Sequence, residues 1–136
     1  MKQALRIRSE VLEGLLEHAR RQAHRECCGL LAGRDGVITQ AFPGENVAVD
    51  PARNYELAPL EIVRLMREFR ARGLDFLGIY HSHPNGKNEP SPRDIELAYY
   101  SEAAYFIVSP RADAPKPVRA FSIRDGQVLE LEIQVV

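Results

Sequence analysis

The spacing of apolar residues changes from block to block along this chain, and two blocks have the period of a helix. The first helix is expected to begin at Ser9 as its N-cap, after a short strand over residues 4–8. The second is expected to begin at Pro59 and to stop at Gly73, because proline suits the first helical turn and glycine the end. Their apolar faces are Val11, Leu12, Leu15, Leu16 and Ala19 in the first, and Ile62, Val63, Met66 and Phe69 in the second.

Other blocks are short apolar runs bounded by turn residues, a pattern typical of buried strands. Asp35-Gly36 and Asp125-Gly126 are strong signals for two-residue hairpin turns. The strands predicted besides residues 4–8 are 28–32, 37–42, 55–57, 76–80, 104–108, 118–123 and 128–133, with a third helix from Pro92. This order predicts a single α/β domain over residues 1–136, a mixed central sheet flanked by helices.

Composition narrows the class of protein without naming a function. The chain has 136 residues, 45% hydrophobic and 27% charged, which is typical of one ordinary globular domain. A formal net charge of -1 gives no overall basic field, so no nucleic-acid partner is expected. The sequence does not determine the oligomeric state, and a homodimer is compatible with it.

The two cysteines, Cys27 and Cys28, are adjacent, so a disulfide between them would close almost no loop. The absence of a C-x-x-C pair excludes a thiolate zinc site or a redox motif of that type. Both are predicted to be small buried residues. Because neither a signal peptide nor a long apolar run is present, no membrane association is expected and the cytoplasm is the default location.

The segment from Leu77 to Asp94 carries the chemistry. A predicted strand ends in His81-Ser82-His83, and alternate strand residues share a face, so both imidazoles should project side by side. After a loop, Ser91 is a predicted N-cap and Asp94 lies in the first turn of the third helix. Two imidazoles and one carboxylate form an open three-ligand site of the kind that catalytic zinc uses, leaving a position for water.

The histidine pair alone is equally compatible with two half-exposed histidines beside a turn. The other histidines, His18 and His24, are predicted to be satisfied or exposed at the first helix, without a metal-binding role. Competing zinc signatures are absent: the chain has neither H-E-x-x-H nor the H-x-E and P-C-x-x-C of a deaminase. It is also too short for a barrel hydrolase.

The full spacing, His81-x-His83, seven residues, Ser91, two residues and Asp94, resembles the metal signature of the JAMM (MPN+) metalloprotease family. The resemblance implies a fold similar to that of cytidine deaminases and one zinc per chain, bound by His81, His83 and Asp94. It also implies that Glu26, before the Cys-Gly-Leu-Leu strand, is the catalytic acid–base. From the residues alone, Glu26 is equally a helix-end surface glutamate. Ser91 would stabilise the oxyanion besides capping the helix.

The compact chain is more similar to bacterial members of the family, which resemble enzymes that trim ubiquitin-like sulfur carriers. The expected reaction is hydrolysis of an amide or isopeptide bond after the carrier's C-terminal Gly-Gly, with release of a cysteine or short peptide. The extended tail is expected to add to a sheet edge beside the metal. Alternatives are a deubiquitinase-like isopeptidase, a non-catalytic MPN interaction module, and a relative of DNA-repair-associated JAMM-like proteins. Retention of the whole ligand set argues against the non-catalytic module. The sequence does not name the carrier.

Overall fold

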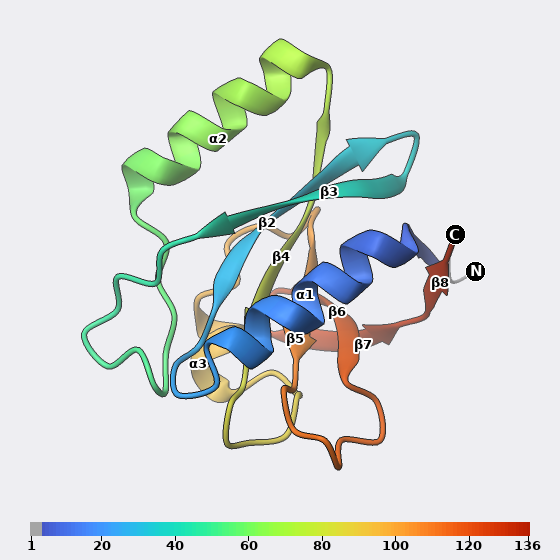
Figure 1. Cartoon of the computed structure of the whole chain (residues 1–136). Coiled ribbons are helices and arrows are strands. Elements are labelled where there is room, and N and C mark those ends of the chain that lie inside the picture. The colour runs from blue at the N-terminus through green and yellow to red at the C-terminus, as the bar shows by residue number, and fades with distance from the viewer. Residues whose placement is uncertain (1–3) are drawn as a thin grey trace.

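The computed structural model describes residues 4–136, which form one eight-stranded sheet and three helices (Figure 1). None of the helices in this range is long and apolar enough to span a membrane. The elements in chain order are β1 (Leu5–Ile7), α1 (Ser9–Arg21), β2 (Cys28–Arg34), β3 (Val37–Gly44), α2 (Pro59–Arg72), β4 (Asp75–Ser82), α3 (Pro92–Glu96), β5 (Ala104–Val108), β6 (Val118–Arg124), β7 (Gln127–Leu131) and β8 (Ile133–Val135).

The sheet is mixed and strongly curled. Its strand order is β7-β6-β5-β4-β2-β3-β1-β8, so β7 and β8 are the two outer strands. Only Glu132 separates them in the chain, although they lie at opposite edges of the sheet. Because consecutive Cα atoms are about 3.8 Å apart, the two edges must meet at this corner. Leu131 and Ile133 both pack against the core cluster that contains α1, so the sheet curls around this helix.

Strand alternation divides the interior into two cores. Ile79 faces the core that includes Leu65 and Phe69 of α2, whereas its neighbour Tyr80 faces the core that includes Leu15 of α1. β4 lies between β2 and β5 in the sheet, and its last five residues, Gly78 to Ser82, are buried. The rigid centre of the sheet therefore carries the strand that ends in the predicted ligands.

The main sequence predictions of the fold are confirmed, including both aspartate–glycine turns. Asp35 and Gly36 have φ of 54° and 75°, and Asp125 and Gly126 have φ of 50° and 76°, as a type I′ hairpin turn requires. Gly73 ends α2 with φ of 66°, where a side chain would be strained. Turn chemistry in the sequence thus sets where the hairpins and α2 end.

Several boundaries predicted from the sequence are wrong. Ser9 is the first helical residue of α1, and the N-cap is Arg8, which makes no side-chain capping bond. Residues 55–57 form no strand, because Glu56 bonds to residues 46 and 47 of the same loop. The strand predicted over residues 128–133 is split at Glu132, because its second part pairs in parallel with β1.

Helix faces were also predicted imperfectly. In α2 the buried residues are Leu65 and Phe69, whereas Val63 is 46% exposed. The third helix, expected from Pro92, is a short one that ends at Glu96. Apolar spacing marks the existence of a helix better than it marks the side that faces the sheet.

His18 is satisfied, as predicted, although it lies in the interior. It is 6% exposed, and its Nδ1 forms a 2.9 Å hydrogen bond with the Tyr80 hydroxyl. Burial, aided by the charge of Arg21, lowers the pKa of His18, so the neutral ring is favoured. His24 is exposed. Neither histidine joins the cluster at the end of β4.

Candidate metal centre

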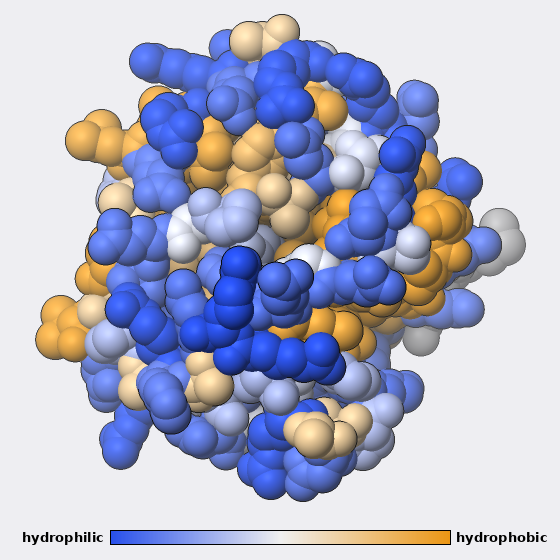
Figure 2. All heavy atoms as spheres, viewed as in Figure 1, coloured by the Kyte–Doolittle hydropathy of each residue, from blue (hydrophilic) through white to orange (hydrophobic). Residues whose placement is uncertain are grey.

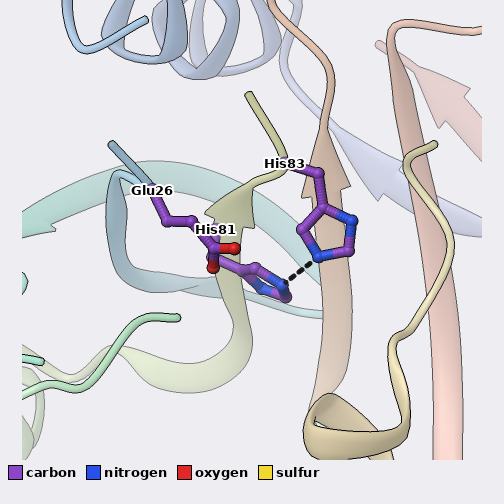
Figure 3. A group of neighbouring side chains, drawn as sticks. All are labelled: Glu26, His81 and His83. Atoms are coloured by element: carbon purple, nitrogen blue, oxygen red, sulfur yellow. Dashed lines mark hydrogen bonds between the residues drawn. The ribbon is translucent and has the colours of Figure 1, made fainter. Parts of the chain in front are cut away.

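Sheet register explains why Glu26 and the histidines converge. Cys28 of β2 is the antiparallel partner of His81, and the Ser82 amide continues this pairing by donating to the Cys27 carbonyl at 3.1 Å. Extending the register by one more residue brings Glu26 opposite His83 on the same face as His81. Figure 3 shows the three side chains meeting in this way, Glu26 from the segment before β2 and the histidines from the end of β4.

Asp94 reaches the two histidines from α3, so all three predicted metal ligands are brought together. Its Oδ2 atom lies 3.3 Å from Nε2 of His81 and 3.1 Å from Nε2 of His83. The two Nε2 atoms are 3.0 Å apart. Three lone-pair-bearing atoms thus form a nearly equilateral triangle.

Hydrogen bonding alone does not account for this triangle. Each Nε2 carries at most one hydrogen, and the carboxylate carries none, so two N–H groups would have to serve three short edges. If both nitrogens were protonated, the two N–H groups would face each other at 3.0 Å. A shared cation, in contrast, accepts all three lone pairs at once.

The triangle has the dimensions of a tetrahedral zinc site. Zinc–nitrogen and zinc–oxygen bonds of about 2.0–2.2 Å in a tetrahedron give ligand–ligand separations of roughly 3.3–3.5 Å. The separations found here, 3.0, 3.1 and 3.3 Å, agree within a few tenths of an ångström. The donor set of two imidazoles and one carboxylate also suits zinc.

The surroundings of each histidine favour coordination through Nε2. Nδ1 of His83 lies 2.8 Å from the Lys87 carbonyl, which can only accept, so this contact places the hydrogen on Nδ1 and the lone pair on Nε2. Among the described residues, Nδ1 of His81 has no hydrogen-bond partner. The His81 ring is instead held by stacking on Tyr55, with centroids 4.3 Å apart and planes 20° apart.

Electrostatics also favour the ligand forms of His81 and Asp94. Burial lowers the pKa of His81, which keeps this imidazole neutral. Burial by itself would raise the pKa of Asp94, but hydrogen bonds with His81 and His83 outweigh it and lower that pKa. Burial also opposes the charge of His83, whose pKa is nevertheless raised by the hydrogen bonds to Asp94 and the Lys87 carbonyl.

Ser91 and Asp94 form a reciprocal capping box at the start of α3. The Asp94 amide donates to Oγ of Ser91 at 3.0 Å, and the Ser91 amide donates to Oδ2 of Asp94 at 2.9 Å. The predicted cap is therefore confirmed, and it orients the carboxylate toward the histidines. Oγ of Ser91 accepts in this contact, so its own hydrogen is left to donate elsewhere.

Glu26 is a buried carboxyl beside the triangle, not the surface residue that the sequence alone allowed. It is 5% exposed, and burial raises its pKa to about 8. To a smaller extent, the nearby His83 lowers the pKa of Glu26 and the nearby Asp94 raises it. One of its carboxylate oxygens and one nitrogen each of His81 and His83 lie within 4.8 Å of one another. Glu26 can therefore reach a molecule bound at the open position, or complete the metal site itself.

A cavity of about 600 Å³ opens beside Asp94. One wall is the loop segment from Asn54 to Leu57, and another is the stretch from Arg93 to Tyr100 that follows Ser91. Most of the lining residues are aliphatic or aromatic, and the aromatic ones are Tyr55, Tyr99, Tyr100 and Tyr105. An extended, largely uncharged segment of a substrate fits such a groove.

Two residues of the site were missed in the sequence. Tyr55 covers His81, and Asn46, buried at 6% exposure, bonds to the backbone of Glu26. Both lie in the loop between β3 and α2, where neither periodicity nor spacing marks them. Only the fold of this loop against β4 reveals their place.

The fold is α/β, and two histidines and an aspartate at the end of β4 and the start of α3 form its candidate metal centre. The sequence matches, over residues 8–124, the family model described as prokaryotic homologs of the JAB domain. The chain belongs to this family, and the resemblance seen in its motif is confirmed.

Curated relatives cover most of the chain. It is 38% identical to the desampylase of Haloferax volcanii over 112 residues, 78% of this chain and 81% of the relative. It is 38% identical to a probable TtuB-protein conjugate cleaving protease of Thermus thermophilus over 127 residues, 90% of this chain and 81% of the relative. It is 33% identical to a CysO-cysteine peptidase of Mycobacterium tuberculosis over 132 residues, 96% of this chain and 90% of the relative.

Solved structures agree with the fold. A solution structure of a protein from Desulfitobacterium hafniense has 32% identity and a TM-score of 0.84, covering 96% of this chain and 92% of the other. A structure described as a JAMM metalloprotease-like zinc site in the proteasome and signalosome has 21% identity and a TM-score of 0.62, covering 97% and 99%. The predicted JAMM-type α/β fold is therefore confirmed.

Proposed function

We propose that this protein is a zinc metallopeptidase that hydrolyses the amide or isopeptide bond after the C-terminal Gly-Gly of a small ubiquitin-like sulfur carrier. The observation that carries the proposal is the triangle of His81, His83 and Asp94, with edges of 3.0–3.3 Å, beside the buried carboxyl of Glu26. A degenerate interaction module would have no reason to maintain this geometry. The non-catalytic alternative is therefore disfavoured.

The names of the relatives support this class of substrate. One is a CysO-cysteine peptidase, and another is a probable protease that cleaves TtuB-protein conjugates. Both names describe hydrolysis at a junction between a protein and the group attached to it, as proposed here. The second name, together with the desampylase, also favours isopeptide bonds to proteins as a further substrate of the same site.

His81, His83 and Asp94 would hold one zinc ion through two neutral nitrogens and one negative oxygen. Bound zinc lowers the pKa of a coordinated water toward neutrality and polarises a carbonyl. Glu26 accepts the proton of the attacking water and delivers it to the leaving amine, a transfer that its buried carboxyl can make without competition from bulk solvent. The Lys87 carbonyl and the Tyr55 ring keep the two imidazoles oriented.

Ser91 would serve both as the helix cap and as a donor to the oxyanion, because its O–H hydrogen is not used in the capping box. We expect Ser91→Ala to retain zinc, since all three ligands remain, and to lower kcat by about 10²-fold, the lower end for loss of an oxyanion donor. Loss of the cap should also destabilise the fold by about 1 kcal/mol. Parallel zinc analysis, kinetics and thermal melting check this; an unchanged kcat would leave Ser91 with the capping role only.

The path of the substrate tail differs from the sequence expectation. β4, which carries His81, pairs with β2 on one side and β5 on the other, so it offers no free edge beside the metal ligands. The loop segment at Tyr55–Leu57 offers a free edge instead. Glu56 turns its carbonyl and amide toward Val47 and Asn46. In an extended segment the backbone groups of the flanking residues, Tyr55 and Leu57, would face the opposite side, and both residues line the cavity.

An extended tail can hydrogen-bond along this exposed segment and bring its last residues to the metal ligands. Small residues are needed next to the cut, because Tyr55 and Glu26 both crowd the cluster. A Gly-Gly terminus satisfies this requirement. The larger cavity farther along Tyr99 and Tyr100 leaves room for bulkier residues upstream.

The folded body of the carrier would contact α2. Arg64, Arg67 and Arg70 are exposed on this helix, beside the exposed side chains of Leu60 and Val63. Figure 2 shows mainly hydrophilic residues over α2 at the top of the view, with hydrophobic residues beside them. This combination suits an acidic partner with a small apolar patch.

The substrate class is tested with carriers of defined ends. Zinc-loaded enzyme is incubated with a Gly-Gly carrier extended by a cysteine or a short peptide, with the same carrier ending in Ala-Ala, and with diubiquitin. Mass spectrometry should show cleavage directly after Gly-Gly and little or no cleavage of the other two. An intact extended carrier beside efficiently cut diubiquitin would favour the deubiquitinase alternative.

A further inference from the structure

Asn46 has an unusually complete set of hydrogen bonds for a loop side chain. It is 6% exposed and follows the end of β3. Its Nδ2 donates to the carbonyls of Glu26 at 2.9 Å, Asn54 at 2.8 Å and Pro51 at 3.4 Å. Its Oδ1 accepts from the amides of Ala48 at 3.0 Å and Glu56 at 3.1 Å. Both hydrogens and both lone pairs of the amide are therefore in use.

Glu26 depends on this loop because it lies outside the sheet. β2 begins at Cys28, so the backbone of Glu26 is not part of the strand ladder. Its carbonyl accepts from Asn46, and its amide donates to the Pro51 carbonyl at 2.7 Å. The neighbouring Arg25 adds a 2.7 Å bond from Nη2 to the Asn46 carbonyl. Both backbone groups of Glu26 are thus bound to the segment that Asn46 organises.

The Asn46 side chain also bonds to the backbone on both sides of Tyr55. Asn46 bonds to the carbonyl of Asn54 and to the amide of Glu56, the residues immediately before and after Tyr55. The Tyr55 ring stacks on His81 at 4.3 Å. One buried amide therefore connects the backbone of Glu26 to the residue that covers a metal ligand.

From these contacts we infer that Asn46 is a positioning residue, which holds the Glu26 carboxyl over His81 and His83 by anchoring its backbone to the loop between β3 and α2. The inference rests on the proposed role of Glu26 in proton transfer. Asn46 makes no hydrogen bond to the side chains of His81, His83 or Asp94, so it acts on the reaction through the backbone that it holds, chiefly that of Glu26. Displacement of a catalytic group by about 1 Å is enough to lower a rate substantially.

No other side chain of similar size reproduces these bonds. Aspartate keeps acceptors for the amides of Ala48 and Glu56 but loses the donors that hold Glu26. Alanine loses both kinds of bond and leaves the carbonyls of Glu26 and Asn54 buried without that partner. Asn46→Asp and Asn46→Ala therefore remove the anchor of Glu26 with different effects on the rest of the loop.

A double-mutant cycle tests whether Asn46 acts through Glu26. With zinc-loaded enzyme, Asn46→Ala should lower kcat by about 10-fold or more, while zinc content stays at the wild-type level. In the Glu26→Gln background the same substitution should lower kcat less than about threefold, because no acid–base group remains to be misplaced. An equal loss in both backgrounds would overturn the inference.

Asn88 provides the matched control. It is 7% exposed, and its Nδ2 donates to the carbonyls of Ile107 and Lys116, at 3.4 and 2.6 Å, without contacting Glu26 or its loop. Any loss of kcat in Asn88→Ala should be the same in both backgrounds. If Asn88→Ala lowers kcat in the wild-type background but not in the Glu26→Gln background, the double-mutant cycle responds to general destabilisation. That result would also count against the inference.

Amide hydrogen exchange gives a readout that needs neither zinc nor activity. In Asn46→Ala the Glu26 amide should exchange at least about 10-fold faster, while amides of Leu30 and Leu31 in β2 keep their protection. Asn46→Asp, the milder variant if alanine does not fold, should release Glu26 but leave the Glu56 amide protected. Unchanged exchange at Glu26 would overturn the inference even if the protein had no peptidase activity, so its failure is distinguishable from failure of the proposed function.

Discussion

His81→Ala and Asp94→Ala are each expected to lose the bound zinc, and kcat should fall by more than about 10³-fold. Each substitution removes one of the three proposed ligands, whose donor atoms lie 3.0–3.3 Å apart. Two remaining ligands are fewer than the three protein ligands that a catalytic zinc site uses. Without the metal, nothing lowers the pKa of water from about 15.7 toward 7. Metal analysis of purified proteins should give one zinc per chain in the wild type and a small fraction of this in each variant.

Two controls separate coordination from folding. His24→Ala removes an exposed histidine outside the cluster and should retain full zinc and activity. Asp94→Ala removes both a proposed ligand and half of the capping box. Ser91→Ala removes the other half of the capping box and leaves all three proposed ligands in place, so it isolates the effect of the cap. Full zinc in both His81→Ala and Asp94→Ala would mean that the metal binds elsewhere.

The second large effect is expected for Glu26→Gln, which should lower kcat by about 10²–10⁴-fold with zinc content and melting temperature nearly unchanged. Glutamine is close to isosteric and removes only the proton acceptor. Because Glu26 is buried with a pKa raised to about 8, its neutral replacement should not destabilise the fold. Steady-state kinetics with the extended carrier, beside zinc analysis, provide the measurement.

Glu13→Gln is the matched control, because Glu13 is an exposed glutamate on α1 and should be dispensable. Loss of zinc in Glu26→Gln would assign Glu26 a ligand role, which its proximity to both histidines permits. Turnover equal to that of the wild type would remove Glu26 from the mechanism.

The sequence by itself determined the local parts of this protein. Asp-Gly pairs define the hairpin turns because they tolerate positive φ, and Gly73 ends α2 for the same reason. Likewise, His81-x-His83 on a strand and Ser91-x-x-Asp94 at a helix start are short-range patterns whose geometry follows from the period of each element. The structure accordingly brings His81, His83 and Asp94 together and caps α3 with Ser91, while zinc binding by the three side chains stays a prediction.

Tertiary structure decided what depends on long-range pairing. Glu26 reaches His83 only because β2 pairs with β4 in a register set by burial on both faces of the sheet. The chain turns at Glu132 because β8 pairs with β1, which is distant in the sequence. Asn46 likewise bonds to the backbone of Glu26, which is distant from it in the sequence. A side chain that bonds to distant backbone leaves no periodic signal in the sequence, because its partners are chosen by the fold.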